Sequence, residues 1–170
     1  MGGNSFPLVI NGHEVDELNF SINSDATRLI FTSGVPLVIM NGHMTTEALF
    51  SSKFNSDLLT QLHNQVDDGS YQYFKRAVSE WMADQKESLG LDGFCNWDVT
   101  TSVYIEHPEL FTRERIFLAY DQRALTQGRI TTADYSDRLA IMPAHISNLA
   151  SFNRLVNQRL VTALTSTIEE

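Results

Sequence analysis

Residues 16–45 constrain the fold more than any other part of this sequence. They read as a polar loop, a helix, an apolar strand and a second polar loop. Asn23 or Ser24 can cap the helix at its start, and Gly34 can end it in a left-handed conformation. The continuous apolar run at residues 35–40 is typical of a strand that is covered on both faces. This order of elements predicts an α/β protein.

Polar residues lie on both sides of this helix and strand. In open α/β sheets, ligands bind beyond the carboxyl ends of the strands, which is where Asn41, His43 and Thr45 follow the predicted strand. Glu17 and Asn19 precede the helix, and residues two apart in an extended loop can point the same way. A carboxylate beside an amide suits a polyhydroxyl ligand, because together they accept from and donate to hydroxyls. The alternative interpretation of Glu17 and Asn19 is a solvated loop.

The composition restricts the possible partners. A chain of 170 residues with 42% hydrophobic residues is expected to form one domain with a real core. The net charge of −9 argues against a nucleic-acid partner or an anionic membrane surface, since both need a basic footprint. No apolar run is long enough to span a bilayer. Cys95 is the only cysteine, which fits a reducing compartment and an expected cytoplasmic location.

The rest of the chain alternates predicted helices and short strands. Apolar residues at a spacing of three or four predict helices at residues 46–50, 56–66, 71–89, 96–106 and 146–164. Short apolar runs next to turn residues predict strands at residues 8–10, 115–120, 129–132 and 138–142. The last three strands have connections too short for crossovers, so we expect an antiparallel ribbon near the C-terminus.

Asp98 is the one residue whose position suggests a metal ligand. It falls in the first turn of the helix predicted at residues 96–106, where the helix dipole stabilises a carboxylate in any case. A carboxylate is also a ligand for Ca²⁺ or Mg²⁺, but Ca²⁺ needs six to eight oxygens, so others must come from elsewhere. No two histidines have the spacing of a zinc site, and we find no nucleophile–base signature. We therefore assign no catalytic residue.

Several short motifs, taken in order, resemble one enzyme family. The motifs are Met1-Gly2-Gly3, Glu17-Leu18-Asn19-Phe20, Asp25-Ala26, Ser33-Gly34-Val35-Pro36 with Thr45, and Trp97-Asp98-Val99 followed by His107-Pro108-Glu109. With this order and spacing, nearly the whole chain resembles the C-terminal part of the nucleoside hydrolases, the inosine–uridine-preferring family.

The resemblance implies both a fold and a reaction. It implies that residues 1–170 are the C-terminal part of a longer nucleoside hydrolase-like domain, with an open sheet and flanking helices. It implies hydrolysis of the N-glycosidic bond of ribonucleosides to ribose and base, with a Ca²⁺ ion holding the ribose diol and the attacking water. By this resemblance Glu17 and Asn19 bind ribose hydroxyls, and Asp98 is a Ca²⁺ ligand.

The sequence also departs from the family pattern. The Asp-rich motif that supplies most metal ligands and the catalytic base does not occur in it, and Trp97 stands where some members have a histidine. We therefore expect the isolated chain to be inactive and to form a homo-oligomer or to need an N-terminal half. Two alternatives remain: a non-catalytic remnant or interaction subunit, suggested by His43 and Asn23-Ser24 in place of family residues, or a ribose- or nucleoside-binding module.

Overall fold

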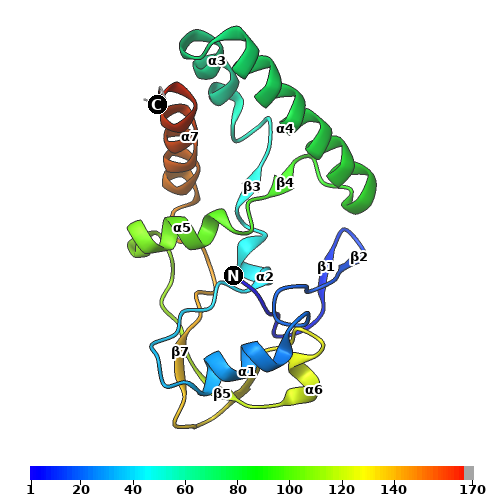
Figure 1. The fold of residues 1–170 in the computed structure, drawn as a ribbon, viewed down its shortest axis with the longest axis vertical. Helices are drawn as coiled ribbons and strands as arrows, with labels where there is room; N and C mark the ends of the chain where they lie inside the picture. The colour runs from blue at the N-terminus through cyan, green and yellow to red at the C-terminus, as the bar shows by residue number, and fades with distance from the viewer. Residues whose placement is uncertain (167–170) are drawn as a thin grey trace.

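The computed structural model describes residues 1–166 as helices around three small antiparallel sheets (Figure 1). The helices are α1 (Ser24–Thr32), α2 (Gly42–Thr45), α3 (Ser56–Gln65), α4 (Asp68–Leu89), α5 (Val99–Glu106), the 3₁₀ helix η1 (Pro108–Leu110), α6 (Gln122–Leu125) and α7 (Leu149–Thr165). The strands are β1 (Leu8–Ile10), β2 (His13–Val15), β3 (Leu49–Phe50), β4 (Phe94–Cys95), β5 (Arg115–Ala119), β6 (Thr131–Ala133) and β7 (Leu139–Ile141). None of the helices in this part of the chain is long and apolar enough to cross a membrane.

Two ends of the molecule are joined through a central core. The β5–β7 ribbon lies with α1 and α6 at one end, and α3, α4 and α7 lie at the other (Figure 1). The core between them is built from buried side chains of α2, α5 and α7 and of the loops beside them. Its buried members are Met40, Met44, Ala48, Val103, Phe111, Ile146, Phe152 and Val156.

Helix α1 begins and ends as predicted. The Asn23 side chain accepts a hydrogen bond from the Ala26 N–H, which satisfies one of the free donors at the start of the helix. Gly34 follows the helix with φ +79°, the left-handed conformation expected there. The local prediction therefore succeeds where it depends on capping chemistry.

The apolar segment after α1 is extended, but the prediction of a regular strand is wrong. Only Val38 forms a bridge, with Ile141 of β7, while the Gly2 N–H donates to the Met40 carbonyl on the other side. Val35 and Val38 stay 49% and 39% exposed. A continuous apolar run indicates a strand buried on both faces only when neighbouring strands cover it, and here one residue pair takes the place of a ladder.

The antiparallel ribbon near the C-terminus is confirmed. Strand β5 lies between β6 and β7, with Phe117 opposite Ala133 on one side and Leu139 on the other. Leu118 and Ala140 are buried in the core of this end of the molecule. The strand predicted at residues 8–10 is also present as β1, and it forms a hairpin with β2, which was not predicted.

The helix predicted at residues 46–50 is wrong. The helix there is α2, which begins four residues earlier, and residues 49 and 50 pair with β4 instead. Asn41 explains the shift, because its side chain accepts the Met44 N–H at 3.0 Å and caps a helix that starts at Gly42. Helix α4 similarly starts three residues before the prediction, capped by Asp67, and α5 starts three residues after it.

A charged contact fastens the start of α7 to the loop after α2. His145 Nδ1 lies 2.6 Å from Glu47 Oε1, and Glu47 Oε2 accepts the Ile146 N–H at 2.8 Å. The hydrogen bond from Glu47 and its negative charge raise the pKa of His145. The folded chain therefore favours the protonated imidazole more than the unfolded chain does.

This contact predicts a pH dependence of stability. A raised pKa in the folded state adds stability below the unfolded pKa of about 6.5, and that stability is lost as the pH rises through the folded pKa. We expect the thermal midpoint of the chain to decrease as the pH is raised from about 6 to about 8. This decrease should be smaller in His145→Gln. His13→Gln, at an exposed position of β2, is the control and should keep the wild-type slope. Equal slopes in wild type and His145→Gln would contradict this assignment.

Candidate functional site

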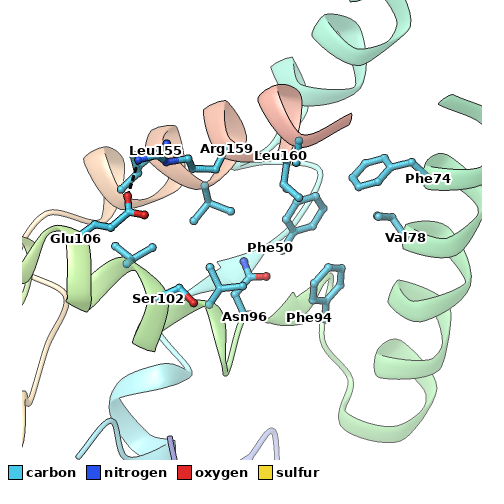
Figure 2. Close-up of a pocket in the computed structure, with 14 residues that line it drawn as sticks. Phe50, Phe74, Val78, Phe94, Asn96, Ser102, Glu106, Leu155, Arg159 and Leu160 are labelled. Atoms are coloured by element: carbon cyan, nitrogen blue, oxygen red, sulfur yellow. Dashed lines mark hydrogen bonds and ion pairs between the residues drawn. The ribbon is translucent and has the colours of Figure 1, made fainter. Parts of the chain in front are cut away.

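Two cavities are candidates for a ligand site. The first is an apolar groove of about 440 Å³ between α4, α5 and α7 (Figure 2). Phe50, Phe74 and Phe94 line it, and the charged residues at its rim, Glu106 and Arg159, are paired with each other. It contains none of the residues that the sequence singled out, and its lining offers little chemistry beyond burial of an apolar group.

The second cavity brings the three predicted site residues together. It has a volume of about 340 Å³ and lies between the loop before α1, the C-terminal half of α4 and the start of α5. Glu17, Asn19 and Asp98 all line it, although 79 positions separate Asn19 from Asp98 in the sequence. The other lining residues are Met1, Gly3, Asn4, Leu8, Val15, Asp16, Leu18, Gly42, Trp81, Gln85, Leu89 and Trp97. We call this space the polar cavity.

Glu17 holds the loop that forms one wall of the polar cavity. Its Oε1 accepts the N–H groups of Gly3 at 3.0 Å, Asn19 at 2.9 Å and Phe20 at 3.0 Å. Its Oε2 accepts the N–H groups of Phe20 and Ser21, both at 3.0 Å. Both carboxylate oxygens are thus occupied by backbone donors, so Glu17 orders the loop rather than lying free in solvent.

Two glycines, Gly128 and Gly3, lie so close to Glu17 and Phe20 that no side chain would fit at either position. A Cβ atom at Gly128 would lie 2.1 Å from Glu17 Oε2, so any larger residue would displace the carboxylate. Gly3 has φ +76°, and a Cβ there would lie 2.6 Å from the Phe20 ring. The ring in turn meets Phe31 of α1 edge-on, with the ring centroids 5.5 Å apart. The cavity wall is therefore tied to the core by backbone, carboxylate and aromatic contacts together.

Asn19 presents its amide at the surface of the cavity. Its Nδ2 donates to the Met1 carbonyl at 3.2 Å, and its Oδ1 accepts no hydrogen bond from residues 1–166. The side chain is exposed. Because Glu17 fixes the Asn19 N–H, the amide is held at the cavity with one free acceptor oxygen.

Asp98 also keeps a free side chain. It occupies the capping position before α5, but its side chain makes no capping hydrogen bond, and it forms no ion pair with another described residue. The helix is held at this point by backbone bonds instead, including Thr101 N–H to the Asp98 carbonyl at 3.0 Å. Its carboxylate is exposed at the cavity and remains available to a ligand.

Two indole rings complete the lining. Trp97 is half-buried, and Trp81 of α4 is 50% exposed. The position of Trp81 in α4 fits an apolar helical spacing, but no residue of α4 is buried. The C-terminal end of α4 is held over the β1–β2 turn, where Asn11 Nδ2 donates to the Leu89 carbonyl at 3.0 Å. Nothing in the sequence distinguished Trp81 from a core residue.

The residues predicted at the end of the apolar strand do not line the cavity. Asn41 caps α2, and the Thr45 hydroxyl donates within the same helix, to the Asn41 and Gly42 carbonyls. His43 Nε2 lies 3.0 Å from the Phe6 carbonyl, and its ring lies against Phe6. Only Gly42 of this segment reaches the polar cavity.

The residues present do not by themselves fit a Ca²⁺ ion. Asp16 and Asp98 each bring one free carboxylate, whereas both oxygens of Glu17 already accept backbone donors. Among residues 1–166, no three histidine, cysteine or acidic side chains are grouped so that they could hold a metal. Six to eight oxygens are needed, so a complete site requires ligands from outside these residues.

Comparison with known proteins identifies the fold. No protein-family model and no curated protein matches the sequence. The solved structures that match include a purine-preferring ribonucleoside hydrolase from Gardnerella vaginalis, with a TM-score of 0.77 and 18% identity over 97% of this chain and 52% of that chain. A plant nucleoside hydrolase matches with a TM-score of 0.60 and 17% identity over 85% of this chain and 46% of that chain. An inosine–uridine-preferring nucleoside hydrolase from Bacillus anthracis matches with a TM-score of 0.64 and 11% identity over 94% of this chain and 50% of that chain.

The chain therefore has a nucleoside hydrolase-like fold and spans about half the length of the solved structures it matches. This confirms the predicted fold class, and it is consistent with a C-terminal portion of a nucleoside hydrolase-like protein. At identities of 18% or less the likeness concerns the fold alone. The roles of Glu17, Asn19 and Asp98 stay predictions.

The Glu17 network predicts a large stability effect. Glu17→Ala leaves four backbone N–H groups without their acceptor, and each such loss costs about 1–3 kcal/mol when the group is buried. Because these donors are only partly buried, we expect a total loss of about 2–4 kcal/mol in the free energy of unfolding, measured by urea denaturation. The exposed Glu14 of β2 provides the control, since Glu14→Ala should change stability by less than about 0.5 kcal/mol. Equal stability of the two variants would show that the network contributes nothing.

Proposed function

We propose that this chain supplies the nucleoside-binding part of a ribonucleoside hydrolase, which cleaves the N-glycosidic bond to release ribose and a base. One observation carries the proposal: a single cavity collects Glu17, Asn19 and Asp98 beside two tryptophans. Amide and carboxylate groups recognise sugar hydroxyls, and indole faces are suited to a planar base. Both kinds of group, on a nucleoside hydrolase-like fold, support a nucleoside as the ligand.

The charge of the cavity supports an unphosphorylated ligand. Asp16, Glu17 and Asp98 line it, and its lining residues include no lysine, arginine or histidine. A nucleotide would bring a phosphate next to these carboxylates, and like charges repel. The neutral nucleoside is therefore the better match.

The residues of this chain would bind and orient the ligand. In the hydrolysis, water adds to C1′ of the ribose, the bond from C1′ to the base nitrogen breaks, and the base leaves with the electron pair and takes up a proton. We propose that Asn19 contacts ribose hydroxyls. We propose two roles for Glu17: the contact with ribose predicted from the sequence, and the positioning of Asn19 through its backbone N–H. With no histidine in the cavity lining, we assign neither proton transfer nor catalysis to a residue of this chain.

We also propose that Asp98 contributes one carboxylate to a Ca²⁺ site that other polypeptide segments complete. The uncovered backbone at Val38 offers a place where such a segment could pair, because neither its N–H nor its carbonyl is hydrogen-bonded within the part of the chain that the structure describes. Unpaired strand edges invite another strand. We therefore propose that the chain works as a homo-oligomer or together with a complementary N-terminal half.

The alternative proposal is a non-catalytic nucleoside-binding module or interaction subunit. It is favoured by the lack of a metal-holding group of side chains within residues 1–166 and by His43, which lies against Phe6 instead of at the cavity. Binding without hydrolysis, even with the complementary half present, is the behaviour that distinguishes it.

Asn19 gives the first test of ligand binding. Asn19→Ala removes the free acceptor oxygen at the cavity, so we expect it to weaken inosine binding about three- to tenfold, as for one lost hydrogen bond. Titration followed by two-dimensional NMR measures this on the intact chain. Asn64→Ala, at an exposed position of α3, is the control and should bind inosine like the wild type. Binding that is unchanged in Asn19→Ala would remove Asn19 from the site.

Hydrolysis gives the second test. With Ca²⁺ and inosine, the chain alone should release no ribose above the uncatalysed rate, because its cavity holds only the two free carboxylates of Asp16 and Asp98 where the metal needs six to eight oxygens. Adding a polypeptide that carries the Asp-rich half should start ribose release, and Asp98→Asn should reduce that release at least tenfold. Ca²⁺-dependent turnover by the chain alone would contradict the half-site assignment, and failure of complementation would favour the non-catalytic module.

A further inference from the structure

Asn4 is the one buried side chain of the polar cavity that lacks a hydrogen-bond partner. It is 6% exposed, and its Oδ1 is fully buried with nothing donating to it. Its Nδ2 donates no hydrogen bond to any residue that the structure describes. A buried amide oxygen left unpaired costs about 1–3 kcal/mol, so the folded chain alone gains nothing from this polar group.

The backbone of Asn4 is fixed although its side chain is not paired. The Asn4 N–H donates to the Gly128 carbonyl at 2.9 Å, and its carbonyl accepts the Ile130 N–H at 2.9 Å. The residue next to it, Gly3, is bound by the Glu17 carboxylate. Asn4 is thus held on the wall that also carries Glu17 and Asn19, with the amide at the cavity.

Gly42 makes the space in which the amide lies. A Cβ atom at Gly42 would come within 2.2 Å of Asn4 Oδ1 and within 3.3 Å of a methyl group of Leu8. Gly42 is the first residue of α2, where alanine is otherwise a good helix former. The absence of a side chain at Gly42 therefore serves the Asn4 amide, not the helix.

We propose that the Asn4 carboxamide hydrogen-bonds a hydroxyl group of the bound sugar, and that Gly42 is the residue that positions it. The proposal rests on the nucleoside-binding function proposed above and adds a recognition group to the same site. Rotation about the Cβ–Cγ bond presents either Oδ1 or Nδ2 to the cavity. A hydroxyl both donates and accepts, so it satisfies whichever end faces it.

Two variants test this inference through inosine binding. Asn4→Ala removes the amide, and Gly42→Ala displaces it while leaving it in the chain. We expect each to weaken inosine binding about tenfold, measured by NMR titration of the intact chain. In the Asn4→Ala background, Gly42→Ala should have no further effect on binding, because the group that it displaces is already gone.

Two controls separate recognition from a structural role. Gly69→Ala, in the first turn of α4, makes the same exchange where the nearest atom to the new Cβ is 3.2 Å away, and it should leave inosine binding unchanged. The base hypoxanthine lacks the sugar, so any binding of it should be equal in wild type and Asn4→Ala. The thermal midpoint of Asn4→Ala should not fall below that of the wild type, since no side-chain hydrogen bond is lost and an unpaired buried oxygen is removed.

The outcomes distinguish this inference from the proposed function. If Asn19→Ala weakens inosine binding and Asn4→Ala does not, the site stands and the role of Asn4 is wrong. If Asn4→Ala lowers the thermal midpoint without changing inosine binding, Asn4 has a structural role only. If the unchanged chain binds no inosine, both the proposed function and this inference are contradicted.

Discussion

The carboxylate of Glu17 is the interaction on which the candidate site depends. It gathers backbone N–H groups from the first residues of the chain and from its own loop, two segments that are also joined by the Asn19 side chain and the Phe20 ring. Charge-assisted hydrogen bonds to backbone donors are stronger than neutral ones, and several of them on one carboxylate fix a loop in a single conformation. Glu17 contributes to the positions of both Asn4 and Asn19, because Asn4 follows Gly3 and Asn19 is itself among the residues that the carboxylate binds.

The same arrangement changes how the loop before α1 is understood. From the sequence, the Glu17 carboxylate and the Asn19 amide are interpreted as two ligand-binding groups with equal roles. In the folded chain they have different tasks: the carboxylate of Glu17 faces the backbone, and the amide of Asn19 faces the cavity. In the proposed nucleoside site, Glu17 would contribute to binding mainly by preorganisation, since an already ordered loop loses less conformational entropy when a ligand arrives.

Much of the fold could be predicted because it depends on local chemistry. The cap at Asn23, the left-handed Gly34 and the short connections of the antiparallel ribbon are all visible in the sequence. The strand at residues 35–40 could not be judged in this way, because its regularity depends on which neighbours cover it. The cavity was predicted only in part: Glu17, Asn19 and Asp98 converge on it, but Asn4 and Trp81 were missed, since burial without a partner and exposure of an aromatic ring are properties of the folded chain.

The two walls of the polar cavity differ in how freely their sequences can vary. On one side, Glu17, Gly3 and Gly128 constrain each other so closely that a change at any of them disturbs the loop. On the other side stands α4, none of whose residues is buried, so that Trp81 and Gln85 can be replaced without opening a hole in the core. Substitutions can therefore change the wall formed by α4 with little effect on the core, whereas the wall that carries Asn4 and Asn19 tolerates change only where Glu17, Gly3 and Gly128 stay compatible with one another.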